Sequence, residues 1–125
     1  MASIPQYAGT PKSGVVQISV ANTNRDGTGT LSTVFIAGAA GSRIDNVIVK
    51  AVSTVTAGMV RLHLHDGVNA RMLTEIAVHA TTPSASVPTF EDGAILDIAI
   101  PAGYSLRAST HNAETFNVIA FGGDF

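Results

Sequence analysis

Apolar and polar residues alternate most regularly along residues 58–80, GMVRLHLHDGVNARMLTEIAVHA. Neighbouring side chains of a β-strand point to opposite faces, so this alternation predicts a strand with one apolar and one polar face. In the first half of the stretch the two alternating sets are Val60, Leu62 and Leu64 against Arg61, His63 and His65. We expect the aliphatic set to face a core and the polar set to face outward.

A turn rich in residues that tolerate positive φ, DGVNA at 66–70, separates this strand from a second one. The apolar side of the second strand consists of Met72, Thr74, Ile76 and Val78. The two strands therefore predict a hairpin, and a turn centred near Val68 sets its register. The expected cross-strand pairs are Arg61 with Glu75, His63 with Leu73, and His65 with Arg71. A slip of one residue would bury the charges, so this register is strongly favoured.

Shorter apolar runs bounded by Gly, Pro and Asn predict six further strands. They cover residues 15–21, 31–37, 43–53, 94–100, 104–109 and 115–121. Two of these, 31–37 and 43–53, are apolar at adjacent positions as well, which predicts burial on both faces. In the first strand, the residues expected to point inward are Val16, Ile18 and Val20. In the last strand, Phe116 and Val118 point inward, which leaves Ile119 and Phe121 facing outward.

Eight short strands at spacings of about 8 to 14 residues predict an all-β fold, an antiparallel sandwich of two sheets. An eight-stranded jelly roll fits the connections, because its fourth and fifth strands are the one sequence-adjacent pair that shares a sheet. An immunoglobulin-like sandwich is the alternative, although the chain lacks the Cys…Trp…Cys pattern of that fold. Residues 14–125 form this single domain, and residues 1–13, which contain two prolines, are predicted to be an extended arm.

The composition changes the picture in one respect, which is the scarcity of charge. Charged residues make up 13% of the 125-residue chain, against about 25% in an ordinary soluble domain. Such a surface suits either a small neutral domain or one that other copies or a partner cover. The net charge of −2 gives no basic footprint for nucleic acid or acidic lipid. No apolar run reaches the length of about 18–20 residues that a membrane span needs, and the N-terminus does not resemble a signal peptide.

Two motifs suggest metal binding. His63 and His65, two residues apart on one strand, project from one face as in metal-binding jelly rolls of the cupin family. The glutamate and the further histidine of that family have no counterpart at the expected spacing, so surface or interface histidines, or a pH-sensitive contact, are the competing interpretations. The run from Asn22 to Gly27, NTNRDG, resembles half of a calcium loop, but Thr33 replaces the bidentate carboxylate, which favours a polar turn.

No constellation for catalysis is evident in the sequence. The chain has no cysteine, no G-x-S-x-G elbow and no phosphate-binding loop between a strand and a helix. We therefore expect no enzymatic activity and no cofactor. What remains is surface that could contact a partner. The predicted interface residues, toward another copy or toward a different partner, are Arg61, His63, His65, Arg71, Leu73, Glu75, Ile119 and Phe121. The arm residues expected to contact a partner are Ile4, Pro5, Tyr7 and Pro11.

Residues 20–125 resemble a group of short β-proteins encoded among the virion genes of tailed bacteriophages. The resemblance is carried by GMVRLHLHDG, RMLTEIAV and IPAGYSLRASTHNAETFNVIAFGGDF, and its most specific part is residues 106–118. It implies a virion structural protein, similar to capsid decoration (cement) proteins that often sit as trimers on the shell. The implied partners are other copies of the chain, as a homotrimer, and the major capsid protein. The implied location is the capsid surface, after assembly in the host cytoplasm. A tail, baseplate or fibre-associated protein is the alternative.

Overall fold

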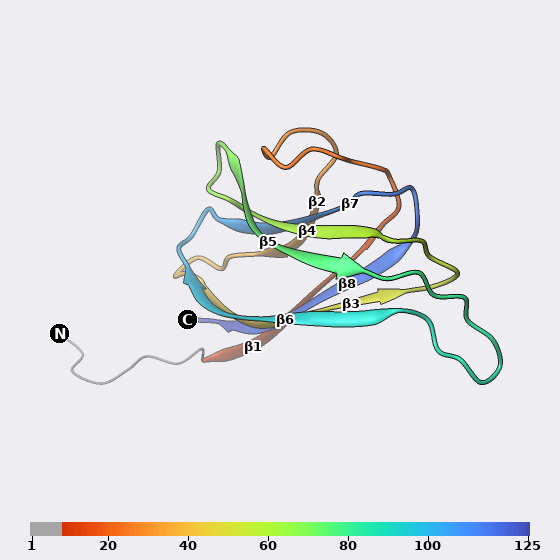
Figure 1. The fold of residues 1–125 in the computed structure, drawn as a ribbon. Helices are drawn as coiled ribbons and strands as arrows, with labels where there is room; N and C mark the ends of the chain where they lie inside the picture. Colours follow the sequence, from red (N-terminus) through yellow and green to blue (C-terminus); the bar gives the residue numbers. More distant parts are fainter. Residues whose placement is uncertain (1–8) are drawn as a thin grey trace.

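The computed structural model describes residues 9–125, which form eight β-strands in two stacked sheets (Figure 1). The strands are β1 (Thr10–Ile18), β2 (Ser32–Ile36), β3 (Ser42–Ala51), β4 (Gly58–His65), β5 (Ala70–Val78), β6 (Glu91–Ile100), β7 (Ser105–Thr110) and β8 (Phe116–Asp124). The predicted all-β sandwich is therefore confirmed. Within residues 9–125 there is no helix that could cross a membrane.

The order of strands identifies the topology. One sheet has the order β1-β8-β3-β6 and the other β2-β7-β4-β5, and all pairs are antiparallel. Only β4 and β5 are adjacent both in sequence and within a sheet, since every other connection crosses between the sheets. This arrangement is an eight-stranded jelly roll, as the pattern of connections suggested.

The core lies between the two sheets, because each strand places apolar side chains inward at every second position. From β4, the side chains of Val60 and Leu62 are completely buried, as the alternation predicts. They pack in one cluster with side chains from both sheets. Among the most deeply buried members of that cluster are Phe35, Ile44, Val47, Val49, Leu106, Phe116 and Val118.

The first strand begins earlier than the sequence suggests. Pro11 pairs with Gly123 inside β1, so residues 10–13 belong to the sheet and not to an arm. An edge strand tolerates proline because one side of its backbone needs no ladder hydrogen bond. The strand also ends at Ile18, and Val20 beyond it is 57% exposed, so the expectation that Val20 points inward is wrong. The other three predicted arm residues, Ile4, Pro5 and Tyr7, lie outside the described residues.

A β-bulge changes the register of the central hairpin. Arg61 lies opposite Glu75 as predicted, but His63 faces Met72 and His65 faces Ala70. The turn is one residue tighter than expected, and the bulge at Leu73 restores the register further along the strand. Counting alternation cannot detect such a bulge, because two consecutive residues of β5 then oppose one residue of β4.

Candidate functional site

The eight predicted interface residues belong to different sheets. Six of them lie on the β4–β5 hairpin, and the other two, Ile119 and Phe121, lie on β8 of the opposite sheet. Phe116 and Val118 are buried, so the outward phase of Ile119 and Phe121 follows the predicted alternation. Because the two groups occupy opposite sides of the sandwich, they cannot form one continuous surface.

Residues 19–31, here called the covering loop, join β1 to β2 and pack over the outer face of β4 and β7 (Figure 1). The backbone N–H of Asn22 donates to the carbonyl of Thr110 in β7 (2.8 Å). The Asn22 amide group donates to the carbonyls of Thr28 and Thr30 (3.0 Å each), which fixes the shape of the loop. At Gly27, φ is +88°, and a Cβ would collide with the carbonyl of Ala70, so only glycine allows this approach.

The same loop explains the resemblance to a calcium motif. The side-chain oxygen of Asn22 accepts a hydrogen bond from the N–H of Asn24 (3.0 Å), and a carboxylate oxygen of Asp26 accepts one from the N–H of Thr28 (3.1 Å). Oxygens that would coordinate a cation thus hold the loop itself together. In the described part of the chain, no three His, Asp or Glu side chains are grouped so that they could hold a metal ion.

Arg61 is completely buried beneath the covering loop, contrary to the expectation that it faces outward. Its Nε donates to a carboxylate oxygen of Glu75 (2.9 Å), and its Nη1 donates to the carbonyl of Asn22 (3.2 Å). Arg25 of the loop donates to the same oxygen of Glu75 (2.8 Å). Hydrogen bonds from Arg25 and Arg61 lower the pKa of Glu75. The network joins the covering loop, through Arg25 and Asn22, to both strands of the hairpin, through Arg61 of β4 and Glu75 of β5.

His63 is also completely buried, and neither ring nitrogen has a hydrogen-bond partner among residues 9–125. Burial, and secondarily the charge of Arg61, lowers the pKa of His63, while Asp26 opposes the shift weakly. His63 therefore presents no surface to a partner, and the expectation that it faces outward is also wrong. His65 is half-buried, and its Nδ1 accepts from the N–H of Gly67 (3.0 Å). This geometry gives no support to a metal site on the two histidines.

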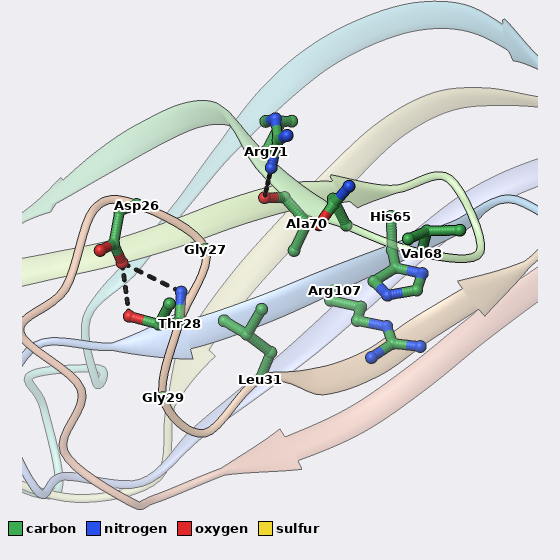
Figure 2. Close-up of a pocket in the computed structure, with 11 residues that line it drawn as sticks. Asp26, Gly27, Thr28, Gly29, Leu31, His65, Val68, Ala70, Arg71 and Arg107 are labelled. Atoms are coloured by element: carbon green, nitrogen blue, oxygen red, sulfur yellow. Dashed lines mark hydrogen bonds between the residues drawn. The ribbon is translucent and has the colours of Figure 1, made fainter.

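A hollow of about 300 Å³ lies between the covering loop and the turn of the hairpin (Figure 2). His65 of β4 and Arg107 of β7, which are paired strands, both lie at one end of it, and Asp26 lies at the other. Arg71 also belongs to the lining, but its guanidinium points away from that pair and donates to the carbonyl of Ala70 (3.2 Å). Arg107 was not singled out from the sequence; its position between the inward Leu106 and Ala108 is the signal that places it outward.

The opposite side of the sandwich carries exposed apolar side chains. Val15, Ile119 and Ile48 form one cross-strand row over β1, β8 and β3. Phe121 belongs to the next row, where Asn46 connects it to Ile95 of β6. These five residues, here called the apolar face, include side chains that are 67% (Val15), 37% (Phe121) and 87% (Ile95) exposed.

The sequence signal for this face was the apolar run Val47-Ile48-Val49 of β3. We interpreted it as burial on both sides, but only Val47 and Val49 are buried, and Ile48 is partly exposed. In β2, Val34 and Phe35 are both buried because a bulge interrupts the alternation there. Ile36 at the end of β2 is 62% exposed, so burial on both sides is wrong for this strand as well.

Comparison with known proteins adds few constraints. No family model matches the sequence, and no curated protein sequence matches it. Two crystal structures of a pentameric capsid protein isolated from metagenomic phage sequences match the fold, each with 16% sequence identity and a TM-score of 0.44. Each alignment covers 88% of this chain, and it spans 60% of one neighbour and 67% of the other. A likeness at this level assigns no residue and no function to this chain.

Proposed function

We propose that this protein is a structural component of a tailed-phage virion, a capsid decoration protein that associates with itself and with the major capsid protein. The sequence resemblance of residues 20–125 supports the virion role, and the scarcity of charged residues is consistent with a surface that partners cover. The observation that carries the proposal is the apolar face, which extends over all four strands of one sheet.

The apolar face has the properties of a subunit interface. Its side chains stand on hydrogen-bonded strands of one sheet, so few conformations are lost when a partner packs against them. Ile95 is 87% exposed and Val15 is 67% exposed, and full burial of one such side chain contributes about 1.5–3 kcal/mol. We infer that this face meets a second copy of the chain. A homotrimer remains the expected assembly. The hairpin residues that are not fully buried, His65, Arg71, Leu73 and Glu75, remain a second predicted contact.

The assembly is tested by Ile95→Asp, with the mass in solution measured by light scattering. The variant should have the mass of one 12.8 kDa chain, while the wild-type protein has a multiple of it. Val68→Asp is the matched control, because Val68 is 81% exposed in the hairpin turn, away from the apolar face. If the Leu73→Asp variant is monomeric while the Ile95→Asp variant keeps the wild-type mass, the interface lies on the hairpin and not on the apolar face. A monomeric wild-type protein would refute self-association.

The location in the virion is tested by separating heads from tails and detecting the protein in each fraction. Recovery with heads supports the decoration role, and recovery with tails would replace it by a baseplate or fibre-associated role. Contact by the arm is tested by deleting residues 2–8, which precede β1 and so leave the described sheet complete. The truncated protein should lose binding to capsids while its thermal unfolding stays unchanged, and retained binding would refute the arm contact.

A further inference from the structure

The basic residues of this chain are almost all neutralised within the fold. All seven lie in the described part of the chain, and five of them form ion pairs with a carboxylate. The five are Lys12, Arg25, Arg43, Lys50 and Arg61. The two arginines without an acidic partner in residues 9–125, Arg71 and Arg107, both line the hollow of Figure 2. An exposed arginine such as Arg71 needs no partner, but Arg107 is half-buried.

Arg107 has unused donors in a partly dehydrated position. It comes from β7, and its only hydrogen bond within the described residues runs from Nε to the hydroxyl of Ser105 (3.3 Å). A guanidinium has five N–H groups in a rigid planar fork, so the four on Nη1 and Nη2 remain available. Since a cation withdrawn from water is stabilised by an opposite charge, this arrangement points to an anion from outside the chain.

His65 adds a neutral donor beside that fork. Its Nδ1 accepts the N–H of Gly67 (3.0 Å), which leaves Nε2 to carry the proton of the neutral ring. Figure 2 shows the imidazole and the Arg107 guanidinium at the same end of the hollow. They come from the paired strands β4 and β7, where His65 lies opposite Ser105 and His63 lies opposite Arg107. The one carboxylate in the lining, Asp26, lies at the opposite end and accepts hydrogen bonds from the N–H and hydroxyl of Thr28.

We propose that Arg107 and His65 form a binding site for an oxyanion, in which the planar fork of Arg107 holds two oxygens and His65 donates from Nε2. Paired N–H donors of arginine match the two oxygens of a phosphate or carboxylate group. The oxyanion is supplied either by free inorganic phosphate or by a carboxylate of a second copy of this chain. The site lies on the β2-β7-β4-β5 sheet, so it does not depend on the role proposed for the apolar face.

The test is a titration of the full-length protein with sodium phosphate at constant ionic strength, with chloride as the balancing anion. NMR signals of the Arg107 Nε–H and the His65 ring report on the site. We expect saturable shifts in the wild-type protein and a loss of affinity of about tenfold or more in Arg107→Gln, since a charge-assisted pair of hydrogen bonds is removed. Arg71→Gln is the matched control, and its affinity should change less than about twofold because its charge is exposed and screened.

The outcomes separate the two sources of the anion. Saturation that is independent of protein concentration indicates free phosphate as the ligand. If a carboxylate of a second copy fills the site, the Arg107 signal depends on protein concentration, phosphate competes with that dependence, and Arg107→Gln lowers the mass in solution. The proposal would be overturned if the NMR shifts rose linearly with phosphate and did not depend on protein concentration. It would also be overturned if Arg107→Gln and Arg71→Gln lost equal affinity for phosphate. Thermal unfolding of both variants confirms that each is folded.

Discussion

Replacing His63 by leucine should stabilise the protein, because it removes a buried imidazole whose two ring nitrogens are both unpaired. Each buried polar group without a partner costs about 1–3 kcal/mol, while an apolar substitution of similar volume at a packed site costs less than about 1.5 kcal/mol. Two such groups cost about 2–6 kcal/mol, so after the packing cost the expected net gain in the free energy of unfolding is at least about 0.5 kcal/mol at pH 7.5. It corresponds to a rise in Tm of a few degrees for each kcal/mol.

The gain should increase in acid, and the sign follows from the lowered pKa of His63 in the folded protein. Above the unfolded value of about 6.5, the ring is neutral in both states and contributes no pH dependence. Below that value the unfolded chain binds a proton that the folded protein refuses, so the wild-type protein loses stability as the pH falls. The loss approaches about 1.4 kcal/mol per pH unit until the folded pKa is reached, and the leucine variant lacks it.

Urea unfolding of the wild-type protein and His63→Leu at several pH values between 7.5 and 5.5 measures this difference directly. We expect this difference to be constant near pH 7.5 and to grow as the pH falls. At pH 5.5, one unit below the unfolded value, the increase is at most about 1.4 kcal/mol. His79→Leu is the control, since that ring is exposed, and its unfolding should follow the pH dependence of the wild-type protein. A difference between wild type and His63→Leu that stays constant over the whole range would refute the reasoning, because it would mean that His63 titrates freely in the folded protein.

Two further predictions concern the attachment of the covering loop. Glu75→Gln should lower the Tm, and the loss should persist at high salt, because the guanidinium of Arg61 stays buried without its carboxylate; an unchanged Tm would contradict this. Gly27→Ala should cost at least about 1–2 kcal/mol for the positive φ alone, and its Cβ would displace the loop from Ala70. Trypsin should then cleave after Arg25 faster than in the wild-type protein, and equal cleavage rates would show that the loop is not anchored there.

The sequence predicted the strands well, because the alternation that defines them is local. Residues 58–80 specify the hairpin through period-two alternation and a turn with glycine and asparagine. The bulge at Leu73 was not predictable in this way. The turn is one residue shorter than alternation alone suggests, and the bulge takes up the extra residue of β5. The start of β1 was missed for a related reason. An edge strand exposed on one face can be built from TPKSG, which has no apolar signal.

The burial of Arg61 and His63 was missed because it depends on a contact between distant parts of the chain. Alternation tells which side of the sheet a residue faces, but not whether another segment covers that side. The covering loop has the composition of an exposed turn, and it reaches β4 only because Asn22 and Gly27 fit against Thr110 and Ala70. Arg107 was missed because a single sequence does not show which charges pair in space, so it cannot show that Arg107 has no acidic partner among residues 9–125.

The covering loop also makes the outer faces of the two sheets unlike each other. One side carries the exposed apolar face, while the other is covered by the chain's own loop and its hydrogen bonds and ion pairs. Molecules that pack through the apolar face would all turn the covering loop toward solvent. An assembly that used both sides would therefore be joined by two unlike contacts, one apolar and one polar.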